Sequence, residues 1–150
     1  MAGRWRNGDP SASISGMDNW KNGVTVVRAA SLAGKGRATA FDFAGTGGQK
    51  TWIGTVTMQP GANTGMHHHQ KHEVAIHVVR GRSEIRWGER LEFAAEIGAG
   101  DFVYFAPYVP HQERNLCDRE TVEFLVVRSG NEAFVTRLEA EPVERQETVF

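Results

Sequence analysis

The sequence is short of cysteine, of net charge and of long apolar runs, and each shortage excludes a class of protein. Its single cysteine, Cys117, excludes an internal disulfide and a paired-cysteine zinc or redox site. The formal net charge is −1, so the chain has no overall basic surface for nucleic acids. No apolar run approaches the roughly 20 residues of a membrane span, and the N-terminus has no continuous apolar signal segment. We therefore expect one cytoplasmic domain without nucleic-acid or membrane partners.

Helical periodicity is scarce, whereas glycine is abundant. The 17 glycines separate short runs rich in β-branched and aromatic residues, such as 74–79 and 122–127. About nine or ten short strands with a turn signal after each are typical of a β-sandwich or barrel. We predict an all-β domain over residues 21–138, after an irregular arm at 1–20 and before a polar tail at 139–150.

Five of the six histidines fall within eleven residues, which is improbable for scattered surface histidines. On a strand, residues i and i+2 share a face, so His67 and His69 point the same way and His68 points away. Glu73 follows after enough residues to turn into the next strand and bring a carboxylate toward both imidazoles. A further ligand must come from elsewhere, and His111 is the only distant histidine. Three neutral nitrogens and one carboxylate suit one divalent transition metal (Fe, Mn, Ni, Zn or Cu) and leave a coordination position open.

The segments around these residues resemble the two sequence motifs of the cupin superfamily. The first motif is a glycine, five residues, His-x-His, a glutamate and a later glycine, here Gly61, His67, His69, Glu73 and Gly81. The second is Gly-Asp, a strand, a proline-rich turn, and a histidine three residues before an asparagine, here Gly100, Asp101, Pro110, His111 and Asn115. The resemblance covers about residues 50–128 and implies a double-stranded β-helix, a jelly-roll barrel of two antiparallel sheets. It also implies His67, His69, Glu73 and His111 as metal ligands, and a homodimer.

The first motif departs from its usual form in one respect. The stretch between Glu73 and Gly81 is one residue longer than the usual pattern. In a register shifted by one residue, Val74 would take the place of Glu73 and could not bind a metal. Three residues between His-x-His and the glutamate is an accepted spacing in the family, so we predict Glu73 as the ligand.

His77 shares the parity of Glu73 on the same strand, so we expect it to face the barrel interior. It is either a core histidine bonded to a neighbour or a catalytic acid or base near the metal, and a bulge would reverse its side. His68 and His72 point away from the site by parity, and an exposed or interface position is expected for both.

The resemblance implies a metal-dependent enzyme acting on a small organic molecule. Oxygenase is the first reaction class to consider, since three histidines and a glutamate resemble the ligands of dioxygenase and oxidase cupins. The same set also occurs in isomerases and decarboxylases, so the fold does not assign the reaction. The alternative is a non-catalytic barrel that binds or senses a small molecule. A purely structural barrel fits less well, because four buried polar ligands without a metal would be costly.

Overall fold

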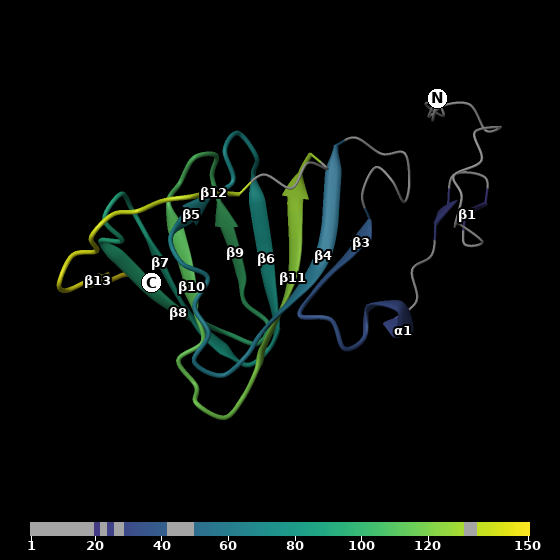
Figure 1. Cartoon of the computed structure of the whole chain (residues 1–150), viewed down its shortest axis with the longest axis horizontal. Coiled ribbons are helices and arrows are strands. Elements are labelled where there is room, and N and C mark those ends of the chain that lie inside the picture. Colours follow the sequence, from purple (N-terminus) through teal and green to yellow (C-terminus); the bar gives the residue numbers. More distant parts are fainter. Residues whose placement is uncertain (1–19, 22–23, 26–28, 42–49, 131–134) are drawn as a thin grey trace.

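The computed structural model of the protein describes residues 20–21, 24–25, 29–41, 50–130 and 135–150. Most of the expected N-terminal arm therefore lies outside the described residues. Within those ranges the chain forms thirteen strands and one short helix (Figure 1). No helix in this described part is long and apolar enough to cross a membrane.

The strands are short and follow one another closely along the chain. Their bounds, with that of the helix, are β1 (Trp20–Lys21), β2 (Val24–Thr25), α1 (Ala29–Leu32), β3 (Arg37–Phe41), β4 (Thr51–Met58), β5 (His67–His68), β6 (Val74–Arg80), β7 (Arg82–Trp87), β8 (Phe93–Gly98), β9 (Phe102–Phe105), β10 (His111–Arg114), β11 (Val122–Ser129), β12 (Thr136–Arg137) and β13 (Glu147–Thr148).

Two large sheets build the domain. One has five strands in the order β3-β4-β11-β6-β9, and the other has six in the order β12-β5-β10-β7-β8-β13. Neighbouring strands pair antiparallel throughout the described residues, except that β13 runs parallel to β8. This arrangement confirms the predicted all-β fold of two sheets.

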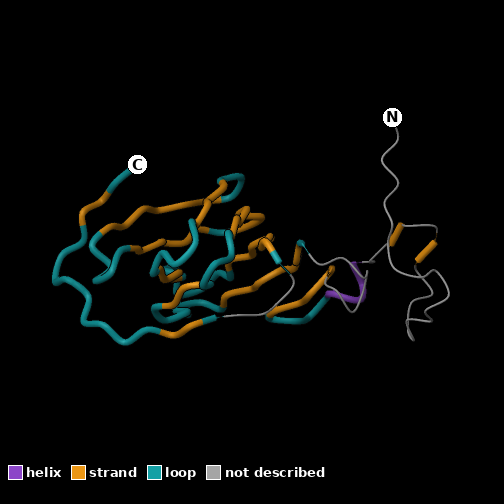
Figure 2. The backbone as a smooth tube through the Cα atoms, turned by 90° about the horizontal axis from the view of Figure 1, so that it is seen from above, coloured by secondary structure: helices purple, strands orange, loops and turns teal. Residues whose placement is uncertain are grey.

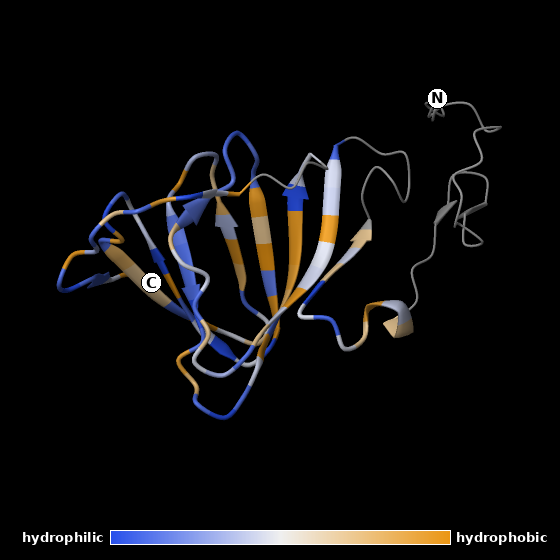
Figure 3. Ribbon diagram, viewed as in Figure 1, coloured by the Kyte–Doolittle hydropathy of each residue, from blue (hydrophilic) through white to orange (hydrophobic). Residues whose placement is uncertain are grey.

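The core lies between the two sheets and takes every second residue of the strands. On β6, Val74, Ile76 and Val78 are at most 3% exposed, and they pack in one cluster with Ile85 and Ile97 of the six-stranded sheet. Burial of these apolar side chains is the main stabilising term of the fold. The strands β6 and β11 are largely hydrophobic, whereas β5 and β10 are largely hydrophilic (Figure 3). The six-stranded sheet is therefore the more polar wall of the barrel.

The polar tail after residue 138 joins the barrel. Between β12 and β13 the chain runs around one end of the sheets (Figures 1 and 2). At the edge of β8, the Glu147 N–H donates to the Glu92 carbonyl at 2.7 Å and the Val149 N–H donates to the Ala94 carbonyl at 2.9 Å. The tail thus covers an edge strand that would otherwise present unpaired backbone groups.

Candidate metal centre

Three imidazoles meet between the sheets. His67 on β5 is the direct cross-strand partner of His111 on the neighbouring β10. His69 follows two residues after His67 and turns to the same side. One ring nitrogen from each histidine lies within 4.8 Å of the other two. The structure thus brings together three of the four ligands predicted from the sequence.

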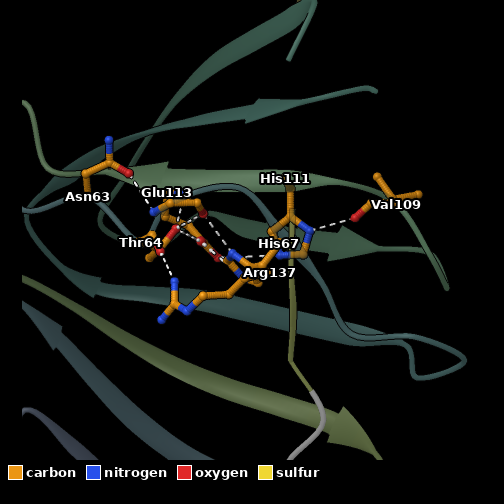
Figure 4. Close-up of polar contacts among 8 residues, drawn as sticks. Asn63, Thr64, His67, Val109, His111, Glu113 and Arg137 are labelled. Carbon is orange, nitrogen blue, oxygen red and sulfur yellow. Dashed lines mark hydrogen bonds and ion pairs between the residues drawn. The ribbon is translucent and has the colours of Figure 1, made fainter. Parts of the chain in front are cut away.

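Backbone carbonyl groups fix the orientation of two of these rings. His67 Nδ1 donates to the Gly65 carbonyl at 2.9 Å, and His111 Nδ1 donates to the Val109 carbonyl at 2.8 Å (Figure 4). Because a carbonyl oxygen only accepts, each Nδ1 carries a proton, and Nε2 is the ring atom left to bind a metal. Metal-binding histidines are commonly oriented in this way.

His111 has the properties of a metal ligand. It is 1% exposed, and its Nε2 atom is buried without a hydrogen-bond partner among the described residues. Burial lowers the pKa of His111, although the nearby Glu113 carboxylate opposes that effect. The neutral ring is favoured, and neutral imidazole is the form that binds metals.

A carboxylate that the sequence analysis did not select lies beside these rings. Glu113 follows His111 by two residues on β10 and shares its face. Its Oε2 is 3.9 Å from His67 Nε2, and its Oε1 is 3.9 Å from His111 Nε2 (Figure 4). The Thr64 hydroxyl donates to Oε2 at 3.0 Å and holds the carboxylate in place. The parity rule that joined His67 to His69 would also have joined His111 to Glu113.

The chemistry of this donor set fits a metal ion. Nitrogen ligands from imidazole and an oxygen ligand from carboxylate suit the divalent transition metals. The group formed by His67, His69 and His111 could therefore hold such an ion, with Glu113 next to it.

Glu73 immediately precedes β6, and its side chain points away from the three histidines. It is exposed, and its carboxylate accepts a hydrogen bond of 2.6 Å from the Tyr104 hydroxyl. This hydrogen bond is the main cause that raises the pKa of Tyr104. The residue that faces inward is Val74. The expectation that Glu73 turns toward the histidines is therefore wrong, because burying an apolar valine is favourable and burying a carboxylate is costly.

His77 also faces away from the centre. Its ring centroid is 4.2 Å from that of Phe102, whose side chain is exposed. The expectation that His77 faces the interior is wrong, because its parity was counted from Glu73. The neighbouring residues on β6, Ile76 and Val78, fill the core instead.

The two remaining histidines have separate surroundings. His68 points away from the centre as expected, and its ring contacts that of Tyr108 at a centroid distance of 5.6 Å. His72 is only 6% exposed, so the expected exposed position is wrong. Its ring packs against the backbone of Gly130, where an added Cβ would lie 2.5 Å from His72 Cε1.

The histidines open onto a cavity between the two sheets. Its volume is about 480 Å³, within the range of sites that take small molecules. His67, His69 and Glu113 line one side. The facing sheet contributes apolar side chains, namely those of Val56, Met58, Val74, Ile76, Phe124 and Val126. Three arginines, Arg37, Arg128 and Arg137, also line the cavity, as do the polar residues Asn63 and Thr64.

Comparison with known proteins assigns this arrangement to a family. The family model of the cupin domain matches residues 54–128, which are 75 of the 150 residues. The chain belongs to the cupin family. No curated protein matches this cupin.

Solved structures share the fold of this cupin. The cupin 2 domain-containing protein from Halorhodospira halophila matches with a TM-score of 0.60 and 26% identity, over 69% of this chain and 70% of that one. A Klebsiella pneumoniae protein with a double-stranded β-helix domain gives a TM-score of 0.59 and 19% identity, over 69% and 84% of the two chains. The polyketide cyclase RemF from Streptomyces resistomycificus gives 0.59 and 21%, over 70% and 71%. The barrel is thus shared with proteins whose sequences differ widely from this one.

Proposed function

We propose that this cupin is a metal-dependent enzyme, an oxygenase, that acts on a small organic molecule held between its two sheets. The observation that carries the proposal is the convergence of three imidazoles and one carboxylate on the wall of a cavity of about 480 Å³. Such a cavity places a small molecule beside the metal ligands.

In this proposal His67, His69 and His111 hold one divalent transition metal through ring nitrogens, and Glu113 supplies the carboxylate. The separations of 3.9 Å between Glu113 and the Nε2 atoms of His67 and His111 are too long for hydrogen bonds. These groups are therefore near neighbours that do not satisfy one another, as expected for ligands of a shared ion. The donor set of three imidazoles and a carboxylate predicted from the sequence is kept, with Glu113 in place of Glu73.

The surrounding residues orient the ligands and the substrate. The carbonyl groups of Gly65 and Val109 hold the rings of His67 and His111, and Thr64 holds Glu113. The apolar side chains of β4, β6 and β11 limit the access of water and pack against the substrate. A bound metal supplies a Lewis acid with coordination positions open to substrate or O₂.

Metal reconstitution combined with oxygen uptake tests the proposal. Tag-free protein is treated with EDTA and reloaded anaerobically with Fe(II), or separately with Mn, Ni, Zn or Cu, and its metal content is measured by mass spectrometry. Oxygen uptake is then followed with a library of small organic compounds. We expect about one metal ion per chain. We also expect the rate of oxygen uptake to fall at least about tenfold in Glu113→Gln. The matched variant Glu73→Gln should retain both properties, because Glu73 contacts Tyr104 outside the cavity.

Two results would contradict this function. No uptake of any of the five metals would overturn the metal centre itself. Binding of a compound without oxygen consumption by any loaded form would exclude the oxygenase and favour the non-catalytic binding barrel.

A further inference from the structure

Arg128 is a buried cation with unused hydrogen-bond donors. It lies on β11, lines the cavity together with Val126, and is 3% exposed. Its Nε and Nη2 atoms are buried and have no hydrogen-bond partner among the described residues. Buried polar groups are nearly always hydrogen-bonded, and a buried charge without a partner is costly. The exception at Arg128 therefore indicates a binding site for a ligand.

The guanidinium of Arg128 is held in position by an aromatic ring. Trp52 on β4 is its direct cross-strand neighbour, and the Arg128 guanidinium carbon lies 4.8 Å from the centre of the Trp52 ring system. Trp52 is fixed in turn, because its indole N–H donates to the Thr39 hydroxyl at 3.2 Å. This contact is not a hydrogen bond to an acceptor atom, and Nε and Nη2 of Arg128 have no acceptor among the described residues. The donors are thus preorganised and remain available.

The cavity around Arg128 carries an excess of positive charge. Arg37 and Arg137 also line it, and Glu113 is its only acidic lining residue in the described part of the chain. Burial, and to a smaller extent the charge of Arg37, lower the pKa of Arg128, as expected for a cation without a counter-ion. Arg137 donates to the Thr64 carbonyl at 3.0 Å beside Glu113 (Figure 4). An anion inside the cavity would offset this excess.

We propose that Arg128 binds the carboxylate of a small organic acid, whose apolar part packs against Phe124 and Val126 in the same cavity as the histidines. Arginine recognises a carboxylate through two parallel N–H donors, which matches the unused groups here. The inference rests on the proposed function of the histidines and adds the substrate class, a carboxylate with an apolar body. It also gives the buried cation a partner that the described residues do not supply.

Binding of matched acids and amides to metal-free protein tests this assignment. The probes are benzoate against benzamide and isovalerate against isovaleramide, measured by calorimetry and thermal shift on EDTA-treated protein. Each pair shares its shape and differs in charge, and the absence of metal prevents coordination of the carboxylate to an ion. We expect the acid of at least one pair to bind tighter than its amide by about tenfold or more, as charge-assisted hydrogen bonds require.

Substitutions assign that difference to Arg128. Arg128→Met should abolish the preference for the acid, and Arg128→Lys should reduce it, because lysine keeps the charge and lacks the planar pair of donors. The control is Arg80→Met, which removes an exposed arginine paired with Glu123 at 3.0 Å and should leave the preference unchanged. Acids that bind no tighter than their amides, or a preference that persists in both Arg128 variants, would overturn the proposal.

Two further readouts separate this inference from its alternatives. If Arg128 only stabilised the fold, Arg128→Met would lower the melting temperature of the ligand-free protein and the unsubstituted protein would bind no acid tighter than its amide; these two results together would overturn a ligand-binding role. We expect no decrease, because an unpaired buried charge is removed. Metal uptake is measured after the same EDTA-treated proteins are reloaded with a divalent transition metal: metal uptake without acid binding would overturn only this inference, and acid binding without metal uptake would overturn only the proposed metal centre.

Discussion

On the inner face of β6, Val74, Ile76 and Val78 are at most 3% exposed, whereas Val79 on the outer face is 53% exposed. The outer face also carries His77 against Phe102, and Glu73, just before the strand, accepts a hydrogen bond from Tyr104. The inner face is therefore apolar. Glu73, which was predicted as a metal ligand, and His77, which was predicted as a catalytic residue, lie outside the barrel.

The inner side of β5 and β10 has the opposite character. There His67 and His111 are buried side by side, with Glu113 next to them. Each sheet thus gives the cavity a different chemistry: metal ligands from the six-stranded sheet, and from the five-stranded sheet an apolar wall with Arg128. A carboxylate on the inner face of β6 would be costly, because that face packs in the apolar core.

The largest difference in metal affinity should appear between loss of a histidine at the metal centre and loss of a histidine on the outer face of β6. His111→Ala removes a buried ring whose Nε2 has no described hydrogen-bond partner, and we expect metal affinity to fall by more than about 100-fold, beyond typical effects of residues behind the ligands. His77→Ala on the outer face should leave affinity unchanged. Competition with a chelator measures both, and equal losses would contradict the separation of the faces.

The two glutamates provide the next comparison. Glu113→Gln should weaken metal binding about 10- to 100-fold, because the carboxylate beside His67 and His111 is lost. Glu73→Gln should change affinity by less than about twofold, because Glu73 is exposed and contacts Tyr104. The same competition assay applies, and a larger effect at Glu73 would reverse the assignment of the carboxylate.

Substitution of two adjacent valines of β6 should change the free energy of unfolding by different amounts. Val78 is 0% exposed and Val79 is 53% exposed. Val78→Ala should cost about 2 kcal/mol in the free energy of unfolding, since it leaves a cavity in the core. Val79→Ala should stay within about 0.5 kcal/mol. Urea unfolding of both variants checks this, and similar losses would mean that β6 does not alternate as described.

The smallest expected effect concerns the outer hydrogen bond between Tyr104 and Glu73. The hydrogen bond to the Glu73 carboxylate raises the pKa of Tyr104, and the negative charge of that carboxylate adds to the effect. Glu73→Gln should therefore lower the pKa of Tyr104 toward its ordinary value. The chain has two tyrosines, so ultraviolet titration alongside Tyr104→Phe isolates this hydroxyl. An unchanged titration in Glu73→Gln would show that the Glu73 carboxylate does not raise the pKa of Tyr104.

Local sequence patterns were sufficient for the fold and for three histidines. Glycine-punctuated strands predicted an all-β sandwich or barrel, the resemblance to cupins implied its two antiparallel sheets, and parity placed His67 with His69. Parity could not be carried from His69 to Glu73, because the turn between them contains Gln70 with a positive φ of 54°. The apolar alternation of Val74, Ile76 and Val78 was the better guide to the inward face of β6.

Other features depend on contacts between distant segments. The strand β13 pairs with β8 across about 50 residues of chain, and no local pattern in the tail indicates that pairing. Arg128 looks like an ordinary charged residue at the end of a strand. Its role becomes visible only when β11 is placed beside Trp52 on β4 and opposite the histidines.

Anomalous X-ray diffraction from crystals of the metal-loaded protein tests the central claim most directly. We predict a single strong peak inside the barrel, bonded to Nε2 of His67 and His111, to a ring nitrogen of His69 and to a carboxylate oxygen of Glu113. A peak bonded to Glu73, or one without these histidines, would contradict the account.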